Sequence, residues 1–358
     1  MQDVYTFKRC ERSNKSEISN VVNQVLETKT NSDYWEWKYF KNPAGQAFSI
    51  LALINGKIVG QLGAIPARFS VRGREVIGAQ EVDAAILEDH RRFDVFLKMI
   101  ALEKQLYLDN NVDFIFGFSN DLTTEIGQAL LQKKRVGPIP RLVKILDIGP
   151  LLRQRFSMNA LPRILSPVGN IMLRIIHPEK ITIPEGMQIE PINRFDGRFD
   201  TFWNRIKEDY PVMMVRDSTY LNWRYVDVPH ANYEIYCLKK IESNEIMGFM
   251  VLGEEQNDYL TGQIFDIVTP RDVDDTVTSC LLRFALERFH QKKAAKAICW
   301  MFSHCHVYPE LTKIGFIPRK RKGRDFLFQS INLQDPAISP ELLENRENWY
   351  VTKGDSDY

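Results

Sequence analysis

The chain has 358 residues, of which 44% are hydrophobic and 26% charged, so it has the composition of a soluble globular protein with room for two domains of ordinary size. Lys and Arg number 47 against 46 Asp and Glu, and this balance gives no argument for binding nucleic acid. Five scattered cysteines are typical of a reducing compartment, the polar N-terminus lacks the apolar core of a signal peptide, and no apolar run is long enough to span a bilayer. We therefore expect a cytoplasmic protein.

The first half of the chain alternates strand and helix patterns. A strand is predicted at 4–9, and the apolar stripe of the next helix starts at Ile18. Ser32 or Asp33 is expected to cap a second short helix, which Asn42-Pro43 ends. Further along come strands at 48–54 and 58–60, a strand containing Asp83, a helix with the apolar face Phe96, Met99, Ile100 and Tyr107, and a strand at 112–119. The order β-α-α-β-β-β-α-β-α-β indicates an α+β fold with a mixed sheet.

One aromatic pattern occurs twice, at 34–43 and at 220–229. Both copies read Tyr, two residues, Trp, a cation, Tyr, three residues and Pro, and they begin 186 residues apart. Hairpin, strand and helix patterns follow each copy in the same order, at an offset that stays between 183 and 188. We expect duplication of one fold unit, in which Trp37 corresponds to Trp223 and Asp83 to Asp266.

This repeat divides the chain into an N-terminal module at 1–149, a linker at 150–184, a C-terminal module at 185–333 and a tail at 334–358. The linker is apolar, with four arginines and no acid between 151 and 178. We expect helical segments packed across both modules, and a contact with a membrane surface is the alternative. The tail carries Trp349 and Tyr350 side by side, so it is expected to dock on the body.

With this order of elements, the chain resembles tandem members of the GNAT family of acyl-CoA-dependent N-acyltransferases. More closely, it resembles the double-GNAT proteins found among bacterial cell-surface polysaccharide genes. The resemblance covers nearly the whole chain. It rests on the Trp-x-Tyr helix followed by Asn-Pro, on the strand end Phe-Gly-Phe-Ser-Asn at 116–120, and on 311–316, which is similar to the family's closing Leu-x-x-x-Gly-Phe.

The resemblance implies that two neighbouring parallel strands separate and hold the acyl-CoA thioester between them, while backbone groups of the fourth strand pair with the pantetheine arm. It also implies a pyrophosphate site at the start of the next helix, in a loop of the type Arg-x-x-Gly-x-Gly/Ala. Arg91 matches the leading arginine, but Arg92 and Asp94 stand at the glycine positions. The residues expected at this donor site are Ile86, Leu87, Arg91, Arg92, Phe93, Asp94 and Asn120. For Asn120, a helix N-cap is an equal alternative.

The corresponding loop of the second module, 270–276, contains three acids and no glycine. Carboxylates repel a pyrophosphate, so we expect acyl-CoA in the first module only.

Amine acylation needs a base for the ammonium proton and an acid for the leaving thiolate. Asp83 and Glu81 lie at the start of the fourth strand, where the family often keeps a carboxylate, and strand alternation is expected to place both on one face. A solvated strand end is the alternative for both. The family's usual thiolate acid is a Tyr four residues before Gly-Phe; Leu311 stands there in the second module, and the first has Lys133 nearby and no Tyr.

Trp35 and Tyr39 are candidates for lining an acceptor pocket, although repeated aromatic residues are more often core. Asp355 and Asp357 are further candidates, since the tail's Gly-Asp-x-Asp resembles the closing segment of the tandem relatives. Consecutive spacing in His304-Cys305-His306 does not suit chelation by one strand face, so no metal is expected.

These patterns predict an N-acyltransferase that moves an acyl group, most simply acetyl, from acyl-CoA to the amine of a small molecule or amino sugar, with a structural second module. Two alternatives stay open. A Fem-like, aminoacyl-tRNA-dependent transferase would lack the standard CoA loop and would suit the basic stretch 319–324. A degenerate pair of modules without activity would be a binding protein.

Overall fold

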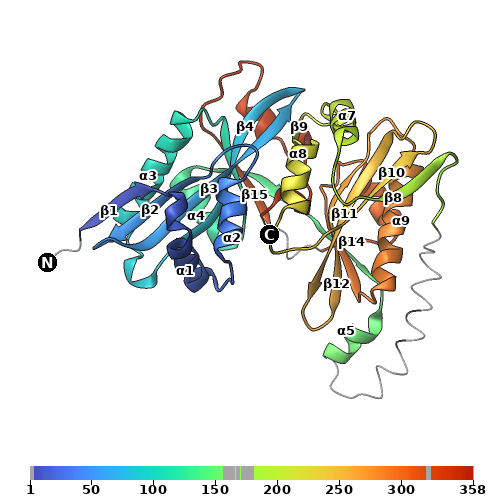
Figure 1. The fold of residues 1–358 in the computed structure, drawn as a ribbon, viewed down its shortest axis with the longest axis horizontal. Helices are drawn as coiled ribbons and strands as arrows, with labels where there is room; N and C mark the ends of the chain where they lie inside the picture. The colour runs from blue at the N-terminus through green and yellow to red at the C-terminus, as the bar shows by residue number, and fades with distance from the viewer. Residues whose placement is uncertain (1–3, 156–165, 167–169, 171–180, 320–323, 358) are drawn as a thin grey trace. The chain divides into compact units, whose positions relative to one another are not determined.

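The computed structural model describes residues 4–155, 166, 170, 181–319 and 324–357 (Figure 1). The chain forms two compact units, each assembled from separate stretches of sequence. Unit 1 consists of 1–137, 211–231 and 325–348, and unit 2 consists of 138–210, 232–324 and 349–358. Each unit contains a mixed β-sheet with helices packed on it, which confirms the predicted α+β class with two sheets.

The sheet of unit 1 has the strand order β1-β2-β3-β4-β5-β15-β6, and β9 extends it at β3. All of its neighbours with a defined register are antiparallel except β4 and β5, which are parallel. The strands are β1 (Tyr5–Arg9), β2 (Phe48–Ile54), β3 (Lys57–Val71), β4 (Arg74–Ile86), β5 (Phe114–Ser119), β6 (Lys134–Pro138), β9 (Val212–Met214) and β15 (Asp325–Ser330).

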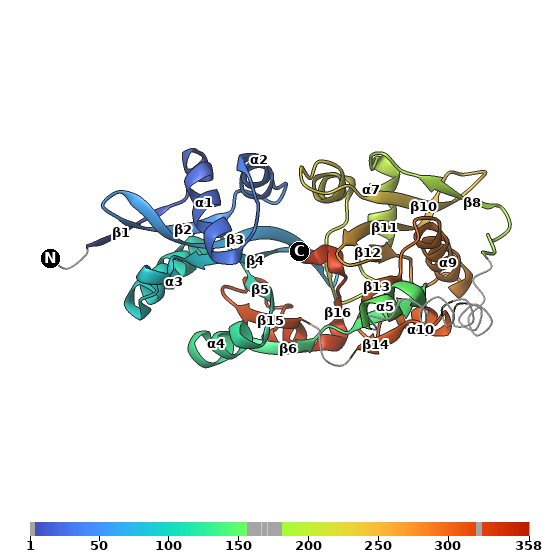
Figure 2. The same cartoon turned by 90° about the horizontal axis from the view of Figure 1, so that it is seen from below.

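Helices cover both faces of this sheet, with α1 (Lys15–Leu26) and α2 (Ser32–Trp35) on one face and α3 (Phe93–Asp109) and α4 (Asp121–Leu131) on the other (Figure 2). The predicted stripe of α1 is confirmed, because Ile18, Val21 and Val22 are buried. The face predicted for α3 is also confirmed, since Met99 is buried beneath the sheet residues Ile50 and Leu62.

The two aromatic repeats fold in the same way. The first forms α2 followed by the π-helical turn η2 (Glu36–Phe40), and the second forms α8 (Ser218–Leu221) followed by the π-helical turn η4 (Asn222–Val226). The cap predicted for α2 is wrong by one position, since the side chain of Asn31 accepts the hydrogen bond from the Tyr34 amide. Single π-turns are rare and occur frequently at functional sites.

The sheet of unit 2 repeats the pattern, with the order β8-β10-β11-β12-β13-β7-β14 and one parallel pair, β12 with β13. Its strands are β8 (Met187–Pro191), β10 (Glu234–Lys240), β11 (Ile246–Gln256), β12 (Leu260–Val268), β13 (Lys296–Trp300), β7 (Arg141–Ile145) and β14 (Ile317–Arg319). Its helices include α5 (Ile148–Arg155), α7 (Gly197–Ile206), α9 (Asp275–Gln291) and α10 (Val307–Lys313). On α9, Leu282, Ala285 and Phe289 are buried on one face.

Each sheet includes at least one strand from the other half of the sequence. The strand β15 pairs with β5 in unit 1, and β7 pairs with β13 in the equivalent place in unit 2. The contiguous ranges 1–149 and 185–333 therefore do not coincide with the compact units, because sequence continuity does not decide which edge a returning strand joins.

Further described elements follow β15 in the sequence, as α11 (Pro340–Glu344), η5 (Arg346–Asn348), β16 (Trp349–Tyr350) and η6 (Lys353–Asp355). Most of the expected helical linker, including 156–165 and 171–180, lies outside the described residues, and so does most of the basic stretch 319–324. No helix among the described residues is long and apolar enough to cross a membrane.

Candidate active site

A β-bulge shapes strand β4 around Asp83. The register with β3 shifts between Gln61 and Gly63, so that Asp83 and Ala84 together oppose a single residue, Leu62. Asp83 has φ of 52°, a left-handed value that is uncommon for residues other than glycine. Bulges of this kind bend a strand and redirect side chains, and they are over-represented next to active sites.

The parallel pairing of β4 with β5 stops beside this bulge. Its last paired residues are Gln80 and Phe116, although β4 continues to Ile86 and β5 to Ser119. We call the ends that do not pair with each other, 81–86 of β4 and 117–119 of β5, the β4–β5 fork. A strand pair that ends here while both strands continue is the feature that the resemblance implied for holding a thioester.

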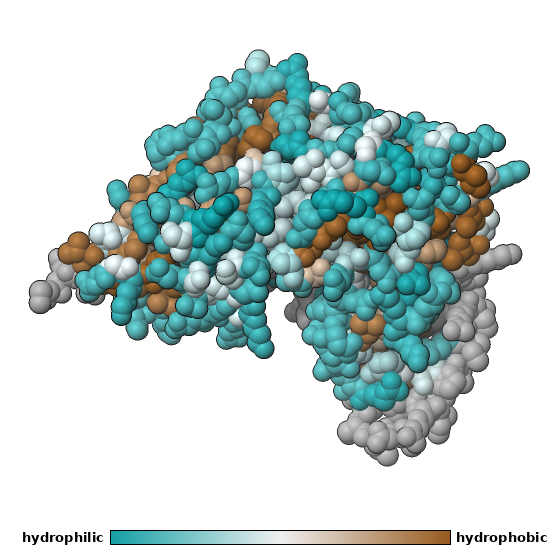
Figure 3. All heavy atoms as spheres, in the orientation of Figure 1, coloured by the Kyte–Doolittle hydropathy of each residue, from teal (hydrophilic) through white to brown (hydrophobic). Residues whose placement is uncertain are grey.

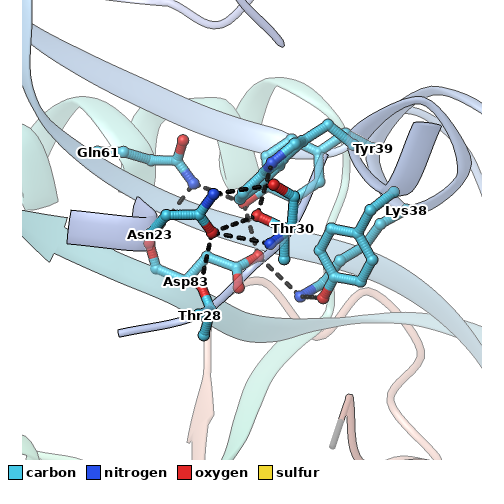
Figure 4. Close-up of polar contacts among 9 residues, drawn as sticks. Asn23, Thr28, Thr30, Lys38, Tyr39, Gln61 and Asp83 are labelled. Atoms are coloured by element: carbon cyan, nitrogen blue, oxygen red, sulfur yellow. Dashed lines mark hydrogen bonds and ion pairs between the residues drawn. The ribbon is translucent and has the colours of Figure 1, made fainter. Parts of the chain in front are cut away.

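The side chain of Asp83 is the centre of a hydrogen-bonded group (Figure 4). Its Oδ2 atom accepts from the Lys38 ammonium at 2.7 Å and from the Tyr39 hydroxyl at 3.1 Å. The Gln61 amide donates to the same hydroxyl at 2.8 Å, and Lys38 also donates to the Tyr34 hydroxyl at 3.0 Å. The group therefore joins the first aromatic repeat to strands β3 and β4.

Burial restricts the positions that the charged side chains of this group can take. The Lys38 side chain is only 1% exposed and that of Asp83 is 11% exposed, so the ion pair lies almost entirely away from water. An unpaired buried charge is costly, and each partner therefore holds the other in position. Burial, and secondarily the nearby Asp83 carboxylate, raise the pKa of Tyr39 well above its ordinary value, so the phenol remains a proton donor.

Hydrogen bonds from the loop between α1 and α2 hold the first aromatic repeat in place (Figure 4). The Asn23 side chain accepts from the Thr30 amide at 2.9 Å and donates to the Thr30 carbonyl at 2.8 Å. The Thr30 hydroxyl then accepts from the indole N–H of Trp35 at 3.2 Å. Trp35 is fully buried and packs edge-on against Tyr39. Both predicted substrate-binding aromatics thus occupy core positions, and of the two only Tyr39 reaches Asp83. Their contact with an acceptor stays a prediction.

Glu81 belongs to a different polar cluster. Its carboxylate forms an ion pair with the buried Lys133, and Gly117 of β5 lies against it. The expectation that alternation places Glu81 and Asp83 on one face is wrong, because the bulge inserts an extra residue between the ladder positions. Glu81 instead lies on the side of helix α3, where burial, and then the Glu81 charge, raise the pKa of Glu103 to about 8.

Sequence reasoning missed Lys38, Gln61 and Glu103. Lys38 had a signal, since both aromatic repeats carry a cation between Trp and Tyr. Glu103 had one as well, because it falls four residues from Met99 and four from Tyr107 on the apolar face of α3. Gln61 gave no signal, as it lies within an apolar strand pattern.

The predicted phosphate loop lies at the start of α3. Arg92 occupies the N-cap position without a side-chain capping bond, and its guanidinium forms a two-bond ion pair with Asp94, at 2.8 and 3.1 Å. The Arg92 partner lowers the pKa of Asp94. Arg91 is exposed and donates through Nε to the Ile86 carbonyl at 3.1 Å. Thus Arg92 offsets the charge of Asp94 directly, while Arg91 extends the exposed basic surface of the loop.

The other predicted donor-site residues border the same region. Ile86 and Leu87 are half-buried where β4 ends, Phe93 is 61% exposed, and Asn120 is exposed directly before α4. Apolar atoms show on the side of unit 1 that carries β1 and α3 (Figure 3). In the sequence, all seven residues predicted to bind the donor therefore lie near the ends of β4 and β5. Their contact with an acyl-CoA donor stays a prediction.

In unit 2, the equivalent loop is closed by its own side chains. The Asp274 carboxylate caps α9 by accepting from the Thr276 amide at 2.8 Å. Arg271 donates through its backbone N–H to the Asp209 carboxylate at 2.8 Å and through its guanidinium to the Asp209 carbonyl at 2.9 Å. This helix start thus has an acid at the position where the start of α3 has an arginine.

Asp266, the counterpart of Asp83, is buried and accepts from the hydroxyl of Thr352 at 3.1 Å. Thr352 belongs to the tail, as do the predicted substrate-binding residues Asp355 and Asp357. Asp355 is buried and accepts from the Thr352 amide at 2.8 Å. A contact of these two carboxylates with substrate stays a prediction.

In the His304-Cys305-His306 segment, the first two side chains share the Trp349 carbonyl, whereas His306 has other partners. His304 bonds the Trp349 carbonyl, and His306 lies between the hydroxyls of Tyr210 and Thr269, each at 2.8 Å. Burial raises the pKa of the Cys305 thiol to about 12, which makes it an inert thiol at neutral pH. Among the described residues, no group of three or more His, Cys, Asp or Glu side chains could hold a metal ion.

Comparison with known proteins gives two results. Residues 6–124 match the acetyltransferase (GNAT) domain family. No curated protein matches the sequence.

Solved structures match over almost the whole chain. A probable N-acyltransferase from Enterococcus faecalis, described as a conserved protein of unknown function, has 10% identity and a TM-score of 0.65 over 92% of this chain and 74% of its own. A GCN5-related N-acetyltransferase from Anabaena variabilis has 11% identity and a TM-score of 0.65 with the same coverage. Saccharomyces cerevisiae N-myristoyltransferase with bound myristoyl-CoA has 11% identity and a TM-score of 0.62 over 95% of this chain and 86% of its own.

The fold is the GNAT acyltransferase fold. At these identities the structural matches establish the fold alone, and the family model matches residues 6–124, about a third of the chain. This agrees with the transferase class predicted from the sequence. The matched GNAT range contains Asp83, the bulge and the loop that begins α3, and it ends within α4.

Proposed function

We propose that this protein transfers an acyl group from acyl-CoA to an amine, with the donor bound at the β4–β5 fork of unit 1. The observation that supports this choice of unit is the difference between the two forks. In unit 1, the fork lies beside Asp83, and an exposed arginine borders the helix that follows. In unit 2, tail residues bond β12 beyond its paired region, and Asp274 caps the helix.

The residues of unit 1 fit an acyl-CoA donor in part. The backbone groups of β4 beyond its pairing with β5 are suited to an extended arm, and Arg91 and the start of α3, whose N-cap residue makes no side-chain capping bond, are suited to phosphate. Asp94 and the missing glycines oppose close approach of the pyrophosphate. The pairing of Arg92 with Asp94 reduces that repulsion but also occupies the guanidinium.

In the proposed reaction the amine nitrogen attacks the thioester carbonyl, a C–N bond forms and the C–S bond breaks. Between ammonium and amide the nitrogen loses two protons; the base takes one and passes it to solvent, and the departing thiolate takes up the other. We propose Asp83 as the group that receives the amine proton, directly or through water, with Lys38 and Tyr39 as positioning residues. The bulge supports this role because it directs Asp83 away from the regular ladder of β4.

For the acceptor, we propose a small amine or an amino sugar, and for the acyl group acetyl. Both come from the resemblance to double-GNAT proteins of polysaccharide gene clusters. The family match to an acetyltransferase domain supports the acyl group.

Calorimetry with acetyl-CoA tests the donor site. Replacing Arg91 and Arg92 together by Ala should weaken binding by about tenfold, since charge-assisted bonds to phosphate are lost. Arg271→Ala, the matched change in unit 2, should leave binding unchanged. Equal losses at both loops would contradict a single donor site, and no binding by the unmodified protein would exclude acyl-CoA as donor.

Asp83→Asn tests the catalytic assignment. Acyl transfer to a panel of amino sugars should fall by about 10²–10⁴, the usual range for a general base, while acetyl-CoA affinity stays unchanged. Because this variant leaves Lys38 without its counter-charge, the double variant Lys38→Met with Asp83→Asn serves as a folding control. Full activity in a folded Asp83→Asn protein would remove Asp83 from the mechanism.

The glycine-poor loop favours one second candidate, an aminoacyl-tRNA-dependent transferase. If acetyl-CoA does not bind, aminoacyl transfer from charged tRNA to an amino-sugar peptide precursor becomes the next assay. Binding of neither donor would leave a non-catalytic binding protein.

A further inference from the structure

The C-terminal segment, residues 349–356, lies against the parts of unit 2 where β12 and β13 stop pairing. We propose that this place is a peptide-binding site and that its ligand is the chain's own segment 349–356. The proposal does not depend on the acyl-transfer reaction, because it concerns the second unit and contacts within it.

The site begins as a second strand fork. The parallel pairing of β12 with β13 ends at Ile264 and Cys299, while β12 continues to Val268. The register of β12 with β11 also shifts near Asp266, as that of β4 shifts near Asp83. Beyond Trp300, the Met301 amide bonds the Pro140 carbonyl at 3.3 Å, next to strand β7. The end of β12 thus extends beyond its pairing with β13.

The segment supplies hydrogen bonds to that end of β12. The hydroxyl of Tyr350 donates to the Ile267 carbonyl, and the hydroxyl of Thr352 donates to the Asp266 carboxylate at 3.1 Å. The Lys353 ammonium lies over the Phe265 ring, 4.5 Å from its centroid. Three consecutive residues of β12 therefore contact the segment, one by its backbone and two by their side chains.

The opposite wall is the loop that follows β13. The Trp349 carbonyl bonds His304 Nε2 at 2.9 Å, and since a carbonyl only accepts, that nitrogen carries the proton. The Tyr350 ring packs against Tyr210, with centroids 4.8 Å apart. One segment thus bonds both sides of the fork, through residue 349 on the β13 side and residues 350, 352 and 353 on the β12 side.

The segment also has structure of its own. Asp355 accepts from the Thr352 amide at 2.8 Å, and the Ser356 hydroxyl donates to the Lys353 carbonyl at 2.8 Å. Trp349 is fully buried and Tyr350 is 2% exposed. Two large aromatic anchors followed by a self-bonded turn are features of a preorganised peptide ligand, which loses less entropy on binding.

The preceding stretch, 325–348, belongs to unit 1. Residues 345–347 are exposed. Cleavage of the backbone there would break the covalent link to the segment and would remove no buried residue. Any association of the segment with the body that remains would then be due to noncovalent contacts.

The first experiment uses the full chain with a specific protease site inserted after Asn345 and cut after folding. We expect the released fragment to co-elute with the body in size-exclusion chromatography, and the cut protein to melt close to the uncut one. Separation of the fragment under native conditions, with an unchanged melting temperature of the body, would overturn the proposal.

The second experiment measures affinity. A chain ending at Asn348 is titrated with a fluorescent peptide corresponding to 346–358, by anisotropy. Peptides carrying Tyr350→Phe or Thr352→Val should bind about tenfold more weakly, since each lacks one buried hydrogen bond. The Glu347→Gln peptide, changed at an exposed residue, is the matched control. Equal affinity of all four peptides would overturn the assignment, and if the shortened chain does not fold, the cut full-length protein is tested by competition with the same peptides.

Discussion

Trp37 and Trp223 form a reciprocal pair: each indole N–H donates to the backbone carbonyl of the other residue, at 2.7 and 3.0 Å. Their rings stack with centroids 4.9 Å apart and an interplanar angle of 19°. The two residues hold the same position in the two aromatic repeats, 186 residues apart, and both belong to unit 1. A reciprocal contact between equivalent residues is what local twofold symmetry produces. The two aromatic repeats are therefore related by local twofold symmetry at this contact, inside one unit.

This pair predicts coupled energetics. Trp37→Phe and Trp223→Phe should each lower the free energy of unfolding by about 1–3 kcal/mol, because each leaves a buried carbonyl without its donor. A double-mutant cycle by urea unfolding should give a coupling of about 0.5–3 kcal/mol, as expected for residues in contact. Trp203→Phe, at a buried site in α7, is the control for loss of indole area. Strict additivity would show that the two bonds act independently.

The exchanged strands predict that neither contiguous half folds alone. A chain of residues 1–149 lacks β15, which lies between β5 and β6 and packs Phe326 and Phe328 against Phe118 and Phe114. A chain of 185–333 lacks β7, the equivalent strand of the other sheet. We expect each half to lack a cooperative thermal transition by circular dichroism, since a central strand is missing from its sheet.

Co-expression of 1–184 with 185–358 is the control, because together they contain every strand. The co-expressed halves should co-purify and melt cooperatively. A well-folded, monomeric 1–149 fragment would contradict the exchange.

Glu103 predicts a dependence of stability on pH. Burial raises its pKa from 4.5 to about 8 in the folded protein. Between these values the folded state keeps a proton that the unfolded state has lost, so the stabilisation present below pH 4.5 is lost as the pH rises to 8. Glu103→Gln should flatten this decline, and its gain in stability over the unmodified protein should be larger at pH 8 than at pH 5.

Urea unfolding at pH 5, 6.5 and 8 measures this effect, and Glu88→Gln, an exposed carboxylate in the same unit, is the control. A constant difference between Glu103→Gln and the unmodified protein at all three values would show that Glu103 does not keep its proton.

Asp94 predicts opposite changes in binding and stability. Asp94→Gly removes a negative charge from the start of α3, releases Arg92 from its ion pair and restores the backbone freedom of the family loop. Acetyl-CoA binding should tighten several-fold by calorimetry, while thermal stability falls through the added chain entropy.

Asp94→Asn separates the two effects, because it removes the charge without adding a glycine. It should tighten binding with a smaller loss of stability. If neither variant changes the affinity for acetyl-CoA, the start of α3 is not the phosphate site.

Much of the fold follows from local sequence. The stripe at Ile18, Val21 and Val22 and the face of α3 are set by the spacing of apolar residues, which is a property of neighbours along the chain. The aromatic repeat likewise predicted two equivalent helices, and both fold with the same π-helical turn. Asp83 was singled out from the sequence as a carboxylate at the start of the fourth strand, but that placement is wrong, since it lies near the end of β4.

The sequence by itself therefore determined the order of the elements, the two mixed sheets, the duplicated aromatic helix and the carboxylate at the fork. Only the tertiary structure decided that β7 and β15 change sheets, that a bulge turns Asp83 away from Glu81, and that Lys38 is its partner. The physical reason is the same in each case. These features depend on contacts between residues 20 to 200 positions apart, and the free energy of such contacts comes from burial and pairing, which no local pattern of side chains encodes.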